Sequence, residues 1–447
     1  MSWRSPAIVA VATIAALTLV GHPAGLGLSA VLIALYVVKQ GVRPPVSRGD
    51  KTIAWWWLLA AGLAAVATVR TAAWVVVPSL LASVALASLA SAGGPSWRQV
   101  GLGLVRIGGT LDGGIAVLRR LPAPAGRPAL RATAIALGVL TVFVPLFATA
   151  DAAFAHLLDA IVPQESADRP VTRTVVWCAV IALGGALLHA RPARPAHPAA
   201  RTLARIEWAL PLSVLVGVFA VFVALQLTTL YGGSDYVLRT AGVTYAEYAR
   251  TGFAQLIAAA ALTLAVIAAA GRWAPDEPLR RILLGALCAL TLVVLASAYT
   301  RLHLYEDAYG FTRLRLAADA AILWLAGLFV LVLAAGATRR FGWLPRGVVA
   351  LSATGMLAFA LSNPDGRIAD RNIDRYGRTG RIDISVLRGL SADAAPALSR
   401  LAPRLAACAT QWMRLDLREP DGLVGLNLGR ARARDAIGDV PAECAGS

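Results

Sequence analysis

Long apolar runs separated by short polar linkers dominate this chain of 447 residues. Hydrophobic residues make up 58% of it and charged residues 15%, whereas soluble domains average about 45–50% and about 25%. A helix that crosses a membrane needs about 20 apolar residues. Eleven runs reach or approach that length: 6–20, 26–38, 53–69, 72–90, 132–150, 174–190, 208–230, 253–270, 282–299, 316–335 and 348–361. The sequence therefore predicts an all-α fold, a polytopic transmembrane helical bundle of about 11 spans without a large soluble catalytic domain.

The distribution of arginine predicts the orientation of this bundle. The net charge is +17, but the basic residues lie in linkers between spans, so they indicate topology rather than nucleic-acid binding. If the N-terminus is cytoplasmic, the cytoplasmic side carries 21 basic and 5 acidic residues, and the linkers on the other side carry 8 and 9. Short cytoplasmic loops are enriched in Lys and Arg. We therefore expect a multi-pass plasma-membrane protein with a cytoplasmic N-terminus and an extracytoplasmic C-terminus.

This layout divides the chain into two regions. Residues 1–361 are expected to form the transmembrane helical domain, with a basic interfacial linker at about 92–131 that contacts membrane lipids. Residues 362–447 are expected to form a small, polar, mostly helical region outside the cytoplasm. Its first helix is predicted to begin at Asn363-Pro364, an N-cap followed by proline, and to end at Gly377.

The four cysteines fall into two pairs. Cys178 and Cys288 lie within apolar runs, where they behave as small hydrophobic residues. Cys408 and Cys444 lie in the C-terminal region, and an extracytoplasmic location permits a disulfide between them. A disulfide that closes this region and two separate thiols both remain open.

Motifs of several enzyme classes are absent from the sequence. There is no phosphate-binding Gly-Lys-Ser/Thr, no Gly-x-Ser-x-Gly elbow, no His-Glu-x-x-His and no Cys-x-x-Cys. We therefore predict no catalytic residue and no cofactor, and the absences favour a protein that is not an enzyme.

Polar and aromatic residues gather instead at the expected outer ends of the spans at 208–230 and 282–299. They form the candidate ligand cluster: Tyr231, Tyr236, Tyr245, Glu247, Tyr248, Arg250, Arg301, His303, Tyr305, Glu306, Tyr309, Arg313 and Arg315. Each also has an ordinary explanation. Tyrosines form the aromatic belt of a bilayer surface, Thr244 and Glu247 are spaced as a capping box, and Thr312 is placed to cap the next span.

A narrower hypothesis concerns the outward continuation of the span at 282–299. On a helix that continues, His303, Glu306 and Asp307 lie within one turn, so they are weak candidates for the ligands of a divalent metal. Such short spacings are common by chance, and a surface histidine paired with a carboxylate is their usual outcome. No metal is therefore assigned.

The arginines of the same segment favour a different ligand. Arg301, Arg313 and Arg315 lie among tyrosines and are equally suited to an anionic lipid headgroup, because a guanidinium binds such groups in a two-pronged geometry. Asp319 enters only the first turns of the next span. It is expected to pair with Arg315 across one helical turn.

Several separated motifs carry a family resemblance. They include Thr244-Tyr245-Ala246-Glu247-Tyr248-Ala249-Arg250, the segment 299–315, Asn363-Pro364-Asp365 and Leu390-Ser391-Ala392-Asp393-Ala394. At these residues the chain resembles a bacterial membrane family catalogued as domain-of-unknown-function family 4173, over about residues 215–398. The resemblance implies an integral bacterial membrane protein with a polar C-terminal region, and it carries no established activity.

Two functional hypotheses of different classes follow. The preferred one is a non-enzymatic protein of the bacterial cell envelope that binds a protein partner or a small ligand, in signalling or assembly, through the outer-face cluster. The alternative is a transporter or a lipid-handling membrane enzyme at the outer leaflet, with or without a metal. In that case Glu247, His303, Glu306 or Asp307 acts as acid, base or metal ligand.

Overall fold

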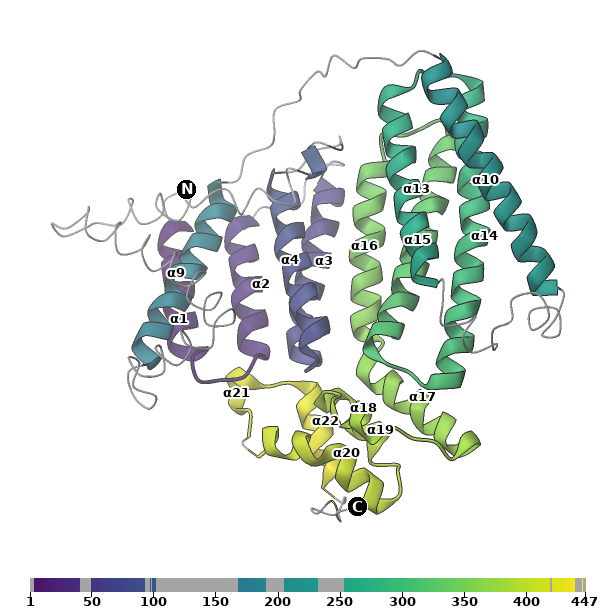
Figure 1. Cartoon of the computed structure of the whole chain (residues 1–447). Coiled ribbons are helices and arrows are strands. Elements are labelled where there is room, and N and C mark those ends of the chain that lie inside the picture. Colours follow the sequence, from purple (N-terminus) through teal and green to yellow (C-terminus); the bar gives the residue numbers. More distant parts are fainter. Residues whose placement is uncertain are drawn as a thin grey trace, which may run out of the picture. The chain divides into compact units, whose positions relative to one another are not determined.

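The computed structural model describes residues 4–40, 50–92, 97, 99–101, 168–189, 205–231, 253–418, 420–438 and 444. These residues are largely helical and include no strand. They divide into two compact units, which we describe separately. Both units combine apolar helices with pieces of the polar C-terminal region (Figure 1).

The first unit contains five apolar helices and two short C-terminal ones. They are α1 (Arg4–Thr18), α2 (Leu26–Gln40), α3 (Asp50–Val69), α4 (Ala73–Ala92), α9 (Asp168–His189), α21 (Gly422–Gly425) and α22 (Leu428–Ile437). Helix α3 packs between α2 and α4, and α1 packs against α2 and α9. A Cβ atom on Gly184 of α9 would lie 2.9 Å from Cγ2 of Ile8. This close approach requires a small residue, as is usual between membrane helices.

Hydroxyl groups also join the helices of the first unit. The Ser29 hydroxyl of α2 donates to the carbonyl of Ala64 in α3 at 2.8 Å. The Ser83 hydroxyl of α4 donates to the carbonyl of Ala60 in α3 at 2.6 Å and lies 2.8 Å from the Tyr36 hydroxyl. Hydrogen bonds of this kind hold membrane helices together where no hydrophobic driving force exists between them.

The second unit contains five long apolar helices and the first part of the C-terminal region. They are α10 (Arg205–Tyr231), α13 (Phe253–Trp273), α14 (Pro278–Tyr309), α15 (Arg313–Thr338), α16 (Leu344–Leu361), α17 (Pro364–Thr379), α18 (Ile384–Arg388) and α19 (Ala395–Leu398). The turn η2 (Ala392–Ala394) and helix α20 (Pro403–Asp416) contribute residues to both units. Helix α14 is central, because α10, α13 and α15 all pack against it.

Side chains of the second unit separate into a buried core and an apolar outer face. Leu287, Leu302 and Phe329 are fully buried between the helices. Helix α10 instead exposes apolar side chains at intervals of four residues: Ile206, Leu210, Val214 and Val218. An apolar stripe directed away from the protein is what lipid contact requires.

Six described helices are long and apolar enough to cross a membrane. They are Ala73–Ser91, Arg205–Ala224, Leu256–Trp273, Pro278–Tyr309, Arg313–Thr338 and Leu344–Leu361. Four shorter apolar helices are Arg4–Thr18, Leu26–Gln40, Ala54–Val69 and Val176–Gly185. Ten of the eleven predicted runs therefore coincide with apolar helices, and the run at 132–150 lies outside the described residues. The protein is membrane-embedded and helical.

Helix α17 begins as the sequence predicts and ends later. Asn363 is its N-cap, with φ +56°, and accepts a hydrogen bond from the amide of Gly366 at 3.2 Å, so this prediction is confirmed. The predicted end at Gly377 is wrong. Gly377 lies inside the helix. Gly380 ends it with φ +68°, and its backbone N–H donates a hydrogen bond to the carbonyl of Tyr376. Glycine is tolerated within a helix, and only the left-handed backbone at Gly380 marks the end.

Candidate functional site

The turn between α14 and α15 carries the polar residues of the second unit. Gly310 ends α14 with φ +84°, a conformation that favours glycine. Thr312 then caps α15, because its side-chain oxygen accepts from the amide of Arg315, and this prediction is confirmed. Two long apolar helices therefore reverse direction over only three residues.

Helix α17 fastens this turn through its own polar side chains. Asn372 donates to the carbonyl of Phe311 at 2.9 Å and accepts from the amide of the same residue at 3.0 Å. Arg375 donates to the carbonyls of Asp307 at 3.0 Å and Ala308 at 2.7 Å. These bonds satisfy the terminal carbonyls that every helix leaves without an internal partner. The end of α14 is thereby fixed relative to α17.

An ion pair adds to this attachment. Arg313, the first residue of α15, donates to both oxygens of Asp365 in α17, at 3.0 and 2.6 Å. The Asp365 side chain is fully buried. A two-pronged arginine–carboxylate pair is among the stronger polar contacts in proteins. Arg313 therefore holds α17 to α15.

Beside this turn, α14 and α15 bring together three potential ligand groups, His303, Glu306 and Asp319, which we call the His303 cluster. One donor atom from each lies within 4.8 Å of the other two. Nδ1 of His303 lies 3.2 Å from Oε2 of Glu306, and Nε2 lies 3.9 Å from Oδ1 of Asp319. The imidazole is thus placed between two carboxylates.

Burial distinguishes this cluster from an ordinary surface pair. The Glu306 side chain is fully buried, that of Asp319 is 13% exposed and that of His303 is 29% exposed. Among the described residues, both carboxylate oxygens of Glu306 and Oδ1 of Asp319 lack a hydrogen-bond partner. Buried charged groups are expected to be paired or to coordinate a metal. Carboxyl groups buried in this way either take up a proton or bind a positive charge.

One aromatic ring contacts the cluster, and one arginine acts on its carboxylates. The Tyr299 ring meets that of His303 edge to face, with centres 4.2 Å apart. The guanidinium of Arg371 lies 5.0 Å from the centre of the Phe311 ring, and its charge acts on both Glu306 and Asp319. A single positive side chain thus influences both carboxylates without a hydrogen bond to the oxygens of Glu306.

The tyrosines and arginines predicted to bind a ligand largely contact one another. Tyr305 and Tyr309 have ring centres 5.0 Å apart, and Tyr309 is exposed. Arg315 lies over the Tyr305 ring at 4.0 Å and also donates to the carbonyl of Gly310. Arg301 is half-buried on α14. The arrangement expected for an anionic headgroup therefore has at least two of its arginines, Arg313 and Arg315, engaged within the protein.

In the sequence, the other members of the predicted ligand cluster fall at or after the end of α10. Tyr231 is the last residue of α10. Five residues lie outside the described residues: Tyr236, Tyr245, Glu247, Tyr248 and Arg250.

The acidic residue that joins His303 and Glu306 differs from the one suggested by sequence spacing. Asp307 is exposed on the neighbouring face of α14 and does not take part in the His303 cluster. The third member of the cluster is Asp319 of α15, whereas the sequence pattern predicts that Asp319 pairs with Arg315. The sequence did contain a signal for Asp319, which lies about two turns into an apolar span. An ionisable residue inside a membrane span is by default a candidate for a functional site.

The C-terminal cysteines lie in the second unit. Cys408 and Cys444 form a disulfide, with Cα atoms 4.6 Å apart. The carbonyl of Cys408 accepts from Nε of Arg388 at 3.2 Å. The bond closes the C-terminal region of this unit.

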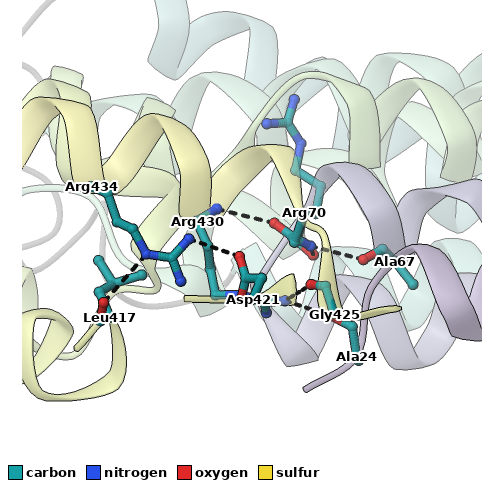
Figure 2. Close-up of polar contacts among 9 residues, drawn as sticks. Ala24, Ala67, Arg70, Leu417, Asp421, Gly425, Arg430 and Arg434 are labelled. Atoms are coloured by element: carbon teal, nitrogen blue, oxygen red, sulfur yellow. Dashed lines mark hydrogen bonds and ion pairs between the residues drawn. The ribbon is translucent and has the colours of Figure 1, made fainter. Parts of the chain in front are cut away.

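In the first unit, the C-terminal region contacts the turns between apolar helices. Asp421 forms ion pairs with Arg430 at 2.5 Å and with Arg434 at 2.9 Å (Figure 2). Asn427 is fully buried; it donates to the carbonyls of Ala67 and Arg70 at 2.8 and 2.9 Å and accepts from the amide of Arg430. We call Asp421, Asn427, Arg430 and Arg434 the Asp421 network.

Two further contacts attach this region to the same unit. Oδ2 of Asp393 accepts from the amides of Thr71 and Ala72, at 2.7 and 3.0 Å, directly before α4 begins. Arg430 also donates to the carbonyl of Ala24, in the turn between α1 and α2. The C-terminal region thus holds two turns that lie at the same end of the helices.

Comparison with known families identifies the chain by sequence. The model of the family described as Domain of unknown function (DUF4153) matches residues 57–401, about three-quarters of the chain. The chain belongs to this family. No curated protein and no solved structure matches it.

This finding corrects the resemblance drawn from the motifs. Family 4173 is wrong, because the matching model is that of a different domain of unknown function. The motifs stand mainly at the ends of apolar helices, where caps, aromatic belts and ion pairs impose similar residues on unrelated membrane proteins. The match to DUF4153 includes the whole His303 cluster and α17.

Proposed function

We propose that this member of the DUF4153 family is a non-enzymatic protein of the bacterial plasma membrane that binds a small cationic ligand at the His303 cluster, in envelope signalling or assembly. The single observation that carries the proposal is Glu306, a fully buried carboxylate with neither oxygen hydrogen-bonded among the described residues. Leaving buried acceptors without partners costs stability. A ligand that supplies the missing partners removes this cost.

The proposal includes about 11 spans, a cytoplasmic N-terminus and an extracytoplasmic C-terminal region. The arginine-rich linkers support this topology. The contacts of the C-terminal region also support this topology. In the first unit this region donates hydrogen bonds to the turns at 19–25 and 70–72, and in the second unit to the turn at 310–312. The alternation of basic and neutral linkers assigns each of these three turns to the extracytoplasmic side.

Membrane-impermeant maleimide labelling of intact cells tests the topology. Cys408 and Cys444 should react only after reduction, because both take part in a disulfide. Labelling only after the cells are lysed would place the C-terminal region in the cytoplasm and contradict the proposal. Mass spectrometry distinguishes these sites from Cys178 and Cys288.

A thermal-shift comparison tests ligand binding at the cluster. Purified full-length protein is heated with a panel of inorganic and organic cations. At least one should raise the melting temperature of the wild type and of Asp307→Asn, the matched control on the exposed face, but not that of Glu306→Gln. A panel in which no cation distinguishes Glu306→Gln from the control would count against the proposal.

A second candidate function is cation-coupled transport. It is favoured by the position of Glu306 and Asp319 within helices long enough to span a membrane, since ionisable residues there commonly mark ion pathways. The test is uptake into liposomes driven by a cation gradient. Uptake that Asp319→Asn abolishes would show that the protein transports a cation rather than only binding it. The engaged state of Arg313 and Arg315 gives the lipid-handling alternative less support.

A further inference from the structure

We infer that the ligand of the His303 cluster is a single divalent transition-metal ion, with Zn²⁺ fitting the donor set. The inference rests on the proposed function, because it names the ligand of the same site. One imidazole nitrogen and two carboxylates converge from α14 and α15. Zn²⁺ accepts both histidine nitrogen and carboxylate oxygen as ligands, and zinc sites with three protein ligands leave a further position for solvent or a partner.

The number of unpartnered acceptors favours a metal over a proton. Three buried oxygens lack hydrogen-bond partners in the described structure: both of Glu306 and Oδ1 of Asp319. A protonated His303 has only two N–H groups, one on each side of the ring. It satisfies at most one oxygen of each carboxylate and leaves one oxygen of Glu306 without a partner. A divalent ion held by both oxygens of Glu306 and by Oδ1 of Asp319 satisfies all three oxygens and balances the charge of the two carboxylates.

The spacing of the donor atoms needs only a small adjustment. Two ligands of one tetrahedral zinc ion lie about 3.4 Å apart, given metal–ligand distances of about 2.0–2.2 Å. The nitrogen–oxygen distances of 3.2 and 3.9 Å involve different nitrogens of the imidazole, so one ion uses only one of them. With one ligand atom from each residue, no pair is more than 4.8 Å apart. The donors therefore close around an ion by rotations of side chains, without movement of either helix.

The surrounding backbone is held in position for such a site. Asn372 and Arg375 of α17 fix the end of α14, and Arg313 fixes the start of α15. Donors on elements held in this way keep their geometry without the ion. The partial exposure of His303 gives an approach for the ion from outside the helices.

Nearby arginines set the affinity and do not occupy the site. The charges of Arg371 and Arg315 act on Glu306, and those of Arg371 and Arg367 act on Asp319. The oxygens of Glu306 nevertheless have no hydrogen bond from any described guanidinium. A positive charge at Arg371 opposes a cation, so Arg371→Gln should bind Zn²⁺ several-fold more tightly than the wild type.

Equilibrium dialysis against Zn²⁺ tests the inference on full-length protein in detergent, with any polyhistidine tag removed. The wild type and Asp307→Asn should hold one ion per chain. Glu306→Gln and Asp319→Asn should each bind it roughly tenfold or more weakly, because each loses a ligand. Co²⁺ added to the wild type should give the visible absorption of a nitrogen–oxygen site, a readout that requires no variant.

Two outcomes would overturn the inference. One is the absence of a stoichiometric ion and of the Co²⁺ absorption; the other is binding that Glu306→Gln and Asp319→Asn leave at the level of Asp307→Asn. If an organic cation still raises the melting temperature through Glu306, the proposed function stands and only the metal is wrong. If no cation does so, both fail.

Discussion

Two buried carboxylates, Asp421 in the first unit and Glu306 in the second, have very different surroundings. Asp421 receives hydrogen bonds from two arginines, and Asn427 beside it has partners for its oxygen and its nitrogen. Glu306 is buried more completely and receives no hydrogen bond from the described residues. Both carboxylates lie near the ends of apolar helices, where the chain reverses direction.

This difference separates polar groups that hold the fold from polar groups available to a ligand. A buried polar network stabilises a protein when each member is satisfied, and it costs stability when members are not. The Asp421 network fits the first description and the His303 cluster the second. Substitutions should therefore have opposite consequences in the two regions, and the following predictions test that contrast.

The largest loss is expected from Asp421→Ala. It leaves Arg430 and Arg434, both partly buried, without their carboxylate. The free energy of unfolding should fall by about 3 kcal/mol, as is typical when one member of a buried ion pair is removed. Thermal unfolding of the full-length protein in detergent measures it.

Asp370→Ala is the matched control, because Asp370 pairs with Arg400 on the surface, where both side chains are about half exposed. The loss there should be less than about 0.5 kcal/mol. Equal losses in the free energy of unfolding for the two variants would mean that the buried ion pairs of Asp421 stabilise the protein no more than a surface pair does.

A smaller loss is expected from Asn427→Ala. The carbonyls of Ala67 and Arg70 lose their donor, and a buried acceptor left in this way costs about 2 kcal/mol. Asn427→Asp keeps the acceptor for the amide of Arg430 but loses the donor, so it should be at least as damaging. Wild-type stability in Asn427→Asp would show that the amide group does not hold the turn.

The stability supplied by Asp421 should also depend on pH. Burial alone raises the pKa of this carboxyl, but hydrogen bonds and charges from Arg434 and Arg430 outweigh it and hold the pKa below its usual range. A carboxyl with a lowered pKa in the folded state contributes its full stability above the unfolded pKa, about 4, and loses it as the pH falls through the folded pKa.

The stability difference between the wild type and Asp421→Asn should therefore be constant from about pH 5 to 7 and shrink below about pH 4. Melting curves of both proteins over this range measure it. A difference that grows as the pH falls would mean that Asp421 is protonated more readily in the folded state.

Sequence patterns predicted those parts of the fold that local physics determines. The apolar runs specified ten helices, because length and composition alone decide whether a helix suits a membrane. Thr312 and Asn363 were recognisable as caps, since a cap is a contact between residues three positions apart. The end of α17 was missed because Gly377 and Gly380 differ only in backbone conformation.

The candidate site was only partly predictable, because its third member comes from another helix. His303 and Glu306 share a turn of α14 and could be paired by spacing. Asp319 was assigned to Arg315 on the same grounds, but Arg315 instead donates to the carbonyl of Gly310 and lies over Tyr305. The partner of Asp319 depends on the packing of α15 against α14, which spacing along the sequence does not show.

The stability of Glu306→Gln without divalent metal tests the central claim most directly. If Glu306 serves to bind a ligand, Glu306→Gln should lower the free energy of unfolding by no more than about 1 kcal/mol, or should raise it. The reason is that a buried charge without a hydrogen bond is costly. Melting of the chelator-treated wild type, Glu306→Gln and Asp307→Asn measures this. A loss as large as that of Asp421→Ala would make Glu306 a structural residue and contradict the account.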